Sequence, residues 1–305
     1  AYDEPFADAS MLPTYYVSKL AREHVTVVLT GDGGDEIFGG YTRYEREMSI
    51  NRIPAFLRAF MGFGSRLMPE GMRGKKRLDM LRHDLATRYA QLFTPFPADA
   101  RPAMYTPEYF ALVGEHDPYA RLINSFQNIA HLDTIRQLQY VDVRAYLTDD
   151  ILVKVDKASM FNSLETRSPL LDQHLAEYVS SLPSTITGRN GVLKYLLKKA
   201  AADILPAEIL QRPKHGFGVP IKHWFRGDLT NYAHDLLDSA RARQRGIFNP
   251  QFVRRLLQSH AHTRLVNHSD AIWALLCLEL WFQVYIDQAG VQVEQGAPIQ
   301  VSSSR

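Results

Sequence analysis

The chain has 305 residues, and its 35 Lys and Arg nearly balance its 33 Asp and Glu. Hydrophobic residues make up 46% and charged residues 22%, which is typical of a globular protein and excludes a chain that is disordered throughout. The net charge of +2 excludes the strongly basic profile of a dedicated nucleic-acid binder. The single cysteine cannot form an internal disulfide, which favours a cytoplasmic location. The sequence has no run of about 18 apolar residues, so no membrane span is predicted.

The predicted elements are mostly helices. Ser10–His24 predicts a helix from apolar residues spaced three or four apart, and Val25–Leu29 predicts a strand. The strand is continuously apolar, which is typical of a strand covered on both faces. Because a lone buried strand cannot satisfy its backbone hydrogen bonds, it needs neighbours. Either further strands escape the pattern or the rest of the sheet lies outside this chain, and we favour the second interpretation.

After the strand the helical pattern continues almost to the end of the chain. Residues 41–180 are mostly helical, Val192–Leu205 is an amphipathic helix closed by Pro206, and Asp270–Ile286 is the last helix. The segment from Ala289 to Arg305 is polar and is predicted to be a flexible tail.

The sharpest motif is Thr30–Tyr41, TGDGGDEIFGGY, directly after the predicted strand. Its glycines suit backbone that turns tightly or approaches a ligand closely. No lysine follows them, so the motif is not a Walker phosphate loop. Its carboxylates Asp32, Asp35 and Glu36 beside exposed amides instead suit a Mg²⁺-polyphosphate at the carboxyl end of a strand. The alternative is an ordinary acidic surface turn.

Two further stretches combine charge with loop residues. In Tyr146–Asp172, helical spacing places Asp150, Lys154 and Lys157 on one face and Asp156 elsewhere, and spacing alone favours an ordinary surface helix with ion pairs. Arg167, before Ser168-Pro169, is expected in a buried polar corner. In Arg212–Gly218, Lys214 is an ordinary solvated lysine unless it faces the glycine motif, where it would neutralise phosphate charge.

Together these stretches resemble the synthetase domain of glutamine-dependent asparagine synthetases and their amidotransferase relatives. The matching segments are DEPFADAS at 3–10, VVLTGDGGDEIFGGY at 27–41, DDILVKVDKASM and SLETRSPLLD within 149–172, and KYLLKKAAADILP and RPKHGFGVP within 194–220. The resemblance implies a mainly α fold with a small α/β part, the remnant of an adenine-nucleotide hydrolase-like (Rossmann-like) domain with a helical extension. Residues 1–288 would form this synthetase part and residues 289–305 the flexible tail.

The resemblance also implies a reaction and a set of site residues. The side-chain carboxylate of aspartate attacks Mg²⁺-ATP to give an acyl-adenylate, and ammonia from a separate glutaminase domain displaces AMP. Asp32 and Lys214 would be catalytic, although many relatives carry Glu at the position of Asp32. The nucleotide or its pyrophosphate would contact Thr30, Gly31, Gly33, Gly34 and Asp35, and Asp35 would also be the Mg²⁺ ligand. The acceptor side would include Asp156, Lys157 and Arg167.

Two motifs of that family are missing from the sequence. The pyrophosphatase loop Ser-Gly-Gly-x-Asp-Ser does not occur, and Cys277 cannot replace the N-terminal cysteine of the glutaminase domain. We therefore expect the C-terminal part of a longer enzyme, inactive alone. Three points stay open: whether the acceptor is aspartate or a carboxylated sugar or other small carboxylate, whether a homodimer forms, and whether the chain is instead a non-catalytic helical module that uses the basic stretch Arg58–Arg88.

Overall fold

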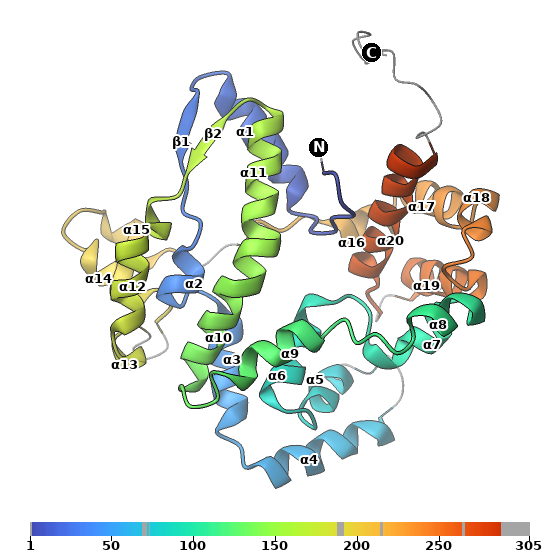
Figure 1. The fold of residues 1–305 in the computed structure, drawn as a ribbon, viewed down its shortest axis with the longest axis horizontal. Helices are drawn as coiled ribbons and strands as arrows, with labels where there is room; N and C mark the ends of the chain where they lie inside the picture. The colour runs from blue at the N-terminus through green and yellow to red at the C-terminus, as the bar shows by residue number, and fades with distance from the viewer. Residues whose placement is uncertain are drawn as a thin grey trace.

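The computed structural model describes residues 2–68, 72, 74–187, 192–213, 216–263 and 266–287. These residues form a mostly helical structure with one two-stranded parallel sheet, β1–β2 (Figure 1). The predicted mainly α fold with a small α/β part is therefore confirmed at this level. The predicted tail, 289–305, lies outside the described residues.

The sheet consists of β1 (Val27–Leu29) and β2 (Glu165–Arg167), with Val28 opposite Thr166. Helix α1 (Met11–Arg22) packs on α11 (Leu152–Phe161), and α11 in turn contacts β2. The expectation that the first strand is covered on both faces is wrong for the described chain, because Val27 is 39% and Leu29 is 74% exposed. The helices of the described chain leave these two side chains uncovered.

A continuous helical rod runs through the molecule from Thr134 to Phe161. It consists of α10 (Thr134–Val141), a π-helical segment η4 (Asp142–Ile151) and α11, seen in green in Figure 1. Its lower part packs in an apolar cluster with α3 (Thr42–Asn51), α6 (Leu85–Ala90) and α9 (Ala120–Gln127). Other helices on this side are α4 (Ala55–Gly64), α5 (Lys75–Met80), α7 (Arg101–Met104) and α8 (Pro107–Val113).

A second apolar cluster joins α2 (Gly34–Phe38), which follows the glycine motif, to α12 (Gln173–Ser181) and α14 (Tyr195–Ala200). The predicted helix Val192–Leu205 is shorter in the structure, because Lys194 has a left-handed backbone with φ of 54° and the regular helix starts only after it. Neighbouring helices are α13 (Ser184–Thr187) and α15 (Ala207–Gln211).

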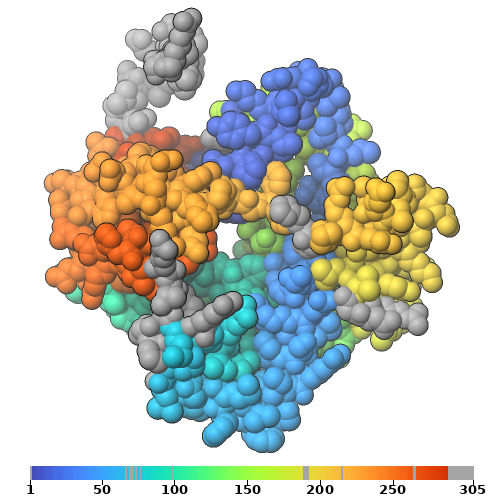
Figure 2. Space-filling model, turned by 180° about the vertical axis from the view of Figure 1, so that it is seen from behind, coloured from blue at the N-terminus to red at the C-terminus, as the bar shows by residue number. Residues whose placement is uncertain are grey.

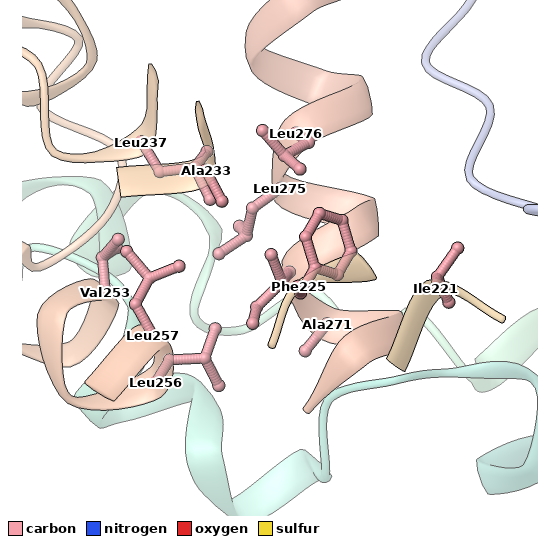
Figure 3. Packing of buried hydrophobic residues seen from close by; sticks show 11 residues of the cluster. Ile221, Phe225, Ala233, Leu237, Val253, Leu256, Leu257, Ala271, Leu275 and Leu276 are labelled. Atoms are coloured by element: carbon pink, nitrogen blue, oxygen red, sulfur yellow. The ribbon is translucent and has the colours of Figure 1, made fainter. Parts of the chain in front are cut away.

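The C-terminal region has its own apolar core, drawn in Figure 3. Phe225 directly follows α16 (Ile221–Trp224) and belongs to this core. Leucines of α17 (Thr230–Leu237), α19 (Pro250–His262) and α20 (Ser269–Trp281) point toward one another. Helix α18 (Ala240–Gln244) connects α17 to α19. The predicted last helix is confirmed, since α20 continues as the π-helical η6 (Phe282–Asp287).

That last helix is the exception to the expectation of no membrane span. Ser269–Asp287 is long and apolar enough to cross a membrane by length and composition, and 33% of its most apolar window is buried inside the protein. Its buried residues, among them Ile272 and Leu275, belong to the C-terminal core. Glu279 on the same helix binds Arg245 at 2.6 Å. We interpret Ser269–Asp287 as the core helix of this region.

Candidate functional site

The glycine motif forms the wall of a cavity of about 790 Å³. Thr30, Gly31, Asp32, Gly33 and Asp35 all line it, so the structure brings five of the predicted site residues together. The surface is hollowed where the N-terminal region (blue) and the C-terminal region (orange) face each other (Figure 2). Gly34, the sixth predicted residue of the motif, is buried at the start of α2. The motif therefore lies at a cavity, at the carboxyl end of β1.

Two glycines of the motif are required by its geometry. Gly33 caps α2 with φ of 82°, and a Cβ there would lie 2.1 Å from a side-chain carbon of Leu171. A Cβ on Gly40 would lie 1.9 Å from Oδ1 of Asp35 and 2.4 Å from Cε of Lys194. Because real side chains do not approach this closely, only glycine lets the chain turn here while Asp35 keeps its position.

The two acids of the motif have different surroundings. Asp35 pairs with Lys194, whose Nζ lies 3.2 Å from Oδ1. Oδ2 of Asp32 is buried and has no hydrogen-bond partner. Buried carboxylate oxygens nearly always have partners, so this atom is a point where a bound ligand would supply one. Thr30 is fixed by a hydrogen bond between its hydroxyl and that of Ser168, at 2.8 Å.

Glu36, the third acid of the motif, faces the same cavity but is only 2% exposed. The hydroxyl of Tyr41 donates a hydrogen bond of 2.5 Å to it. Burial raises the pKa of Glu36, and the hydrogen bond from Tyr41 opposes that effect only in part. Gln139 of α10 holds the backbone of Glu36 and Ile37 through two further hydrogen bonds, which tie α2 to the helical rod.

An ionic cluster of Asp8, Ser10 and Lys154 also lines this cavity. Nζ of Lys154 on α11 lies 2.6 Å from Asp8 and 2.8 Å from the Ser10 hydroxyl, and Lys154 is 7% exposed. The interpretation of Lys154 as part of an ordinary surface helix is therefore wrong: its partners are 146 and 144 residues away. Burial disfavours the ionised form of Asp8, but the charge and hydrogen bond of Lys154 lower its pKa overall. Burial and the nearby Asp8 charge raise the pKa of Asp150 to about 7.

The structure does not bring the predicted acceptor residues to this cavity. Asp156 is exposed on α11, and Lys157 pairs with Asp3 at 2.6 Å. Arg167 is 65% exposed and pairs with Glu165 on its own strand, so the buried polar corner expected there is wrong. None of these three side chains lines the cavity. Strand β2 turns Arg167 outward, because alternate residues of a strand point to opposite faces.

The remaining predicted site residue, Lys214, lies outside the described residues. The described part of its loop, Gly216, Phe217 and Gly218, lines the cavity. Sequence reasoning also missed Asp8 and Tyr146 as cavity residues. The signal for Asp8 was its place in DEPFADAS, but nothing in the local spacing pairs it with a lysine so far along the chain.

The described residues of the basic stretch Arg58–Arg88 do not all contribute their charge to the surface. Arg88 is completely buried and binds Glu47 at 2.9 Å, and Arg58 donates a hydrogen bond to Asn51. Part of the apparent charge excess is therefore used inside the protein. This observation argues against the non-catalytic module as an alternative.

The fold and the site define a mostly helical protein in which a glycine-rich acidic loop follows a parallel strand and lines a cavity. Residues 1–283 match the family model for asparagine synthase. The chain belongs to the asparagine synthase family. It is 34% identical over 294 residues to asparagine synthetase [glutamine-hydrolyzing] 1 of Bacillus subtilis, covering 94% of this chain and 45% of that protein.

Two further relatives show the spread of the family. A putative asparagine synthetase [glutamine-hydrolyzing] of Mycobacterium bovis is 36% identical over 302 residues, covering 95% of this chain and 44% of that protein. The protein named amidase chry2 of Gibberella zeae is 24% identical over 261 residues, covering 74% of this chain and 37% of its own length. The chain thus spans less than half the length of these relatives.

Proposed function

We propose that the chain is the synthetase part of an ATP-dependent, amide-forming ligase that uses ammonia released from glutamine. A carboxylate oxygen of the acceptor attacks the α-phosphorus of ATP, the bond to the β-phosphate breaks, and pyrophosphate leaves. The nitrogen of ammonia then attacks the acyl carbon, AMP leaves, and the nitrogen loses a proton as the amide forms. The acceptor is aspartate or another small carboxylate, such as a carboxylated sugar.

The observation that carries this proposal is the glycine loop at the end of β1, which lines a cavity large enough for a nucleotide. In the proposal, Thr30 and the backbone amides of Gly31 and Gly33 donate to phosphate oxygens, as amide groups in a glycine loop do. The amide of Gly34 already donates to the carbonyl oxygen of Gly31. We further propose that β1 and β2 belong to a Rossmann-like sheet whose other strands come from elsewhere in the protein, with residues 1–288 forming one synthetase unit.

Asp32 is proposed to act in forming or resolving the adenylate. Its buried Oδ2 lacks a protein partner, which leaves it free to take the proton that ammonia loses. Lys214 is proposed to neutralise charge on the phosphate. Its loop continues into Gly216–Gly218 at the cavity wall, which supports this role.

The residues fit a Mg²⁺ ion that is bound mainly by its substrate. Among the described residues, no group of three or more His, Cys, Asp and Glu side chains gathers to hold a metal. Mg²⁺ usually keeps several waters and binds one or two carboxylates together with phosphates. Asp35, which lines the cavity, would hold it. When bound, the ion would neutralise charge on the polyphosphate.

The direct test uses the full-length protein with glutamine, Mg²⁺-ATP and aspartate. We expect asparagine, AMP and pyrophosphate in equal amounts. Asp32→Asn should lower the rate of amide formation by about 10²–10⁴-fold, because it removes the base that takes the proton from ammonia. The exposed Asp203→Asn is the matched control and should leave that rate unchanged. Amide formation that releases ADP and phosphate instead of AMP would contradict the proposed mechanism.

A further inference from the structure

A second cavity, of about 770 Å³, adjoins the first. The two share a wall made by residues far apart in the sequence: Asp8, Ser10, Tyr146, Phe217 and Gly218. Beyond this wall the second cavity extends between η4 of the helical rod and the start of α20, where Asp270 and Trp273 line it. No residue of the glycine loop lines the second cavity, so a molecule that extends past the shared residues would leave the loop behind.

Two polar atoms of this second cavity have no partner. Only three buried side-chain nitrogen or oxygen atoms of the described chain lack a hydrogen bond: Oδ2 of Asp32, Oδ1 of Asp150 and Nε1 of Trp273. Asp32 lines the first cavity, and Asp150 and Trp273 both line the second. Leaving such an atom unsatisfied costs about 1–3 kcal/mol. An acceptor oxygen and a donor nitrogen on side chains that line one cavity therefore mark a place where a polar ligand completes the bonding.

The backbone that carries Asp150 is unusual. Tyr146, Asp149 and Asp150 all belong to the π-helical segment η4, and all three line the second cavity. π-helical turns are rare and often occur at functional sites, because they redirect side chains that an α-helix would place elsewhere. Asp270 on α20 adds a further carboxylate to the same cavity. Four acids and two arginines, Arg43 and Arg46, line the cavity, so its wall favours a cationic group on balance.

We propose that the second cavity binds the acceptor and that this acceptor is a carboxylate longer than aspartate that also carries an amino group. The inference rests on the proposed function. The amino group would donate to Asp150, and a carbonyl or hydroxyl oxygen would accept from Nε1 of Trp273. Free aspartate would fill only a small part of 770 Å³, since cavities of about 300–1,000 Å³ hold drug-sized ligands. An amino sugar acid and an amino-bearing peptide share this chemistry.

The test measures ATP–pyrophosphate exchange of the full-length protein with four probes. They are L-aspartate, D-glucuronate, 2-amino-2-deoxy-D-glucuronate and the dipeptide aspartyl-lysine. The two glucuronates differ only in the amino group, and the dipeptide separates a peptide source from a sugar source. We expect at least one amino-bearing long probe to exceed aspartate about tenfold or more in kcat/KM. Trp273→Phe should raise the KM of that probe about tenfold or more and leave the KM of ATP unchanged, because it removes one donor and keeps the ring.

Trp281→Phe is the matched control on the same helix. The indole of Trp281 donates to the backbone oxygen of Asp3 at 2.8 Å and does not line the cavity, so the acceptor KM should stay unchanged. Exchange that is best with aspartate and insensitive to Trp273→Phe would overturn this inference and leave the proposed function intact. No exchange with any of the four probes, in a preparation that is folded by circular dichroism, would overturn both.

Discussion

Two buried groups of charged side chains differ in how completely their polar atoms are hydrogen-bonded. Beneath α3 and α6, Arg88 binds Glu47, and Asp142 accepts hydrogen bonds from Arg43, Tyr44 and Tyr89. The guanidinium of Arg43 also lies 3.7 Å from the ring centre of Tyr41. At the cavities, by contrast, Asp32 and Asp150 each keep a buried oxygen without a partner.

The difference separates structure from function. A network in which the buried groups are paired stabilises one arrangement of the helices and leaves nothing for a ligand. A network with unpaired atoms costs stability and persists where a bound molecule completes it. On this criterion the Arg88 and Asp142 networks are structural, and the cluster around Asp8, Lys154 and Asp150 belongs to the site.

The largest expected effect breaks the structural network. Arg88→Met removes the buried partner of Glu47 and leaves it only Arg46, whose side chain is 44% exposed. We expect the free energy of unfolding to fall by about 3–5 kcal/mol, the usual cost of removing one partner of a buried ion pair. Urea denaturation of the chain measures it. The double variant Arg88→Met/Glu47→Leu removes both charges and should recover most of the loss; if it is as unstable as the single variant, the pairing argument is wrong.

An intermediate effect is expected at the glycine loop. A methyl group on Gly40 would displace Asp35 and Lys194, so Gly40→Ala should reduce ATP–pyrophosphate exchange at least tenfold and cost about 1–3 kcal/mol of stability, as overpacking does. Gly64→Ala is the matched control. A Cβ at Gly64 would meet nothing within 4 Å, and the backbone there is helical. Gly64→Ala should therefore raise the free energy of unfolding by about 0.5–1 kcal/mol. Equal losses of exchange in both variants would show that the close approach to Asp35 has no role.

The same contrast explains how much the sequence could predict. The glycine loop was predictable because its signal is local: glycines and acids directly after an apolar strand. The α1 helix was predictable from its periodicity, and α20 from its apolar, aromatic-rich composition, which are also local signals. The Asp8–Lys154 pair and the approach of Lys194 to Asp35 join residues 146 and 159 positions apart, and no spacing rule reports such contacts. The outward turn of Arg167 depends on which face of a short strand is covered, which only the tertiary structure decides.

The smallest expected effect sharpens the comparison through pH. The pKa of Asp150 is raised to about 7 by burial and by the charge of Asp8, against an ordinary value of 3.8. The folded state therefore binds more protons than the unfolded state between these values, and its stability from this group is lost as pH rises from about 4 to 7. Asp150→Asn removes the titration and should leave stability nearly unchanged at pH 4.

At pH 8 the same variant should unfold about 2–4 °C higher, the shift that roughly 1 kcal/mol produces in a domain of about 150–250 residues. The difference in Tm between Asp150→Asn and the wild type, measured from pH 4 to pH 8, isolates Asp150 from the acids the two proteins share. A difference that is constant with pH would mean that Asp150 ionises normally. The difference in Tm should grow with pH, and the variant should also have a higher KM for the amino-bearing acceptor than the wild type. Both results together would mean that the carboxylate of Asp150 lowers stability and binds the acceptor.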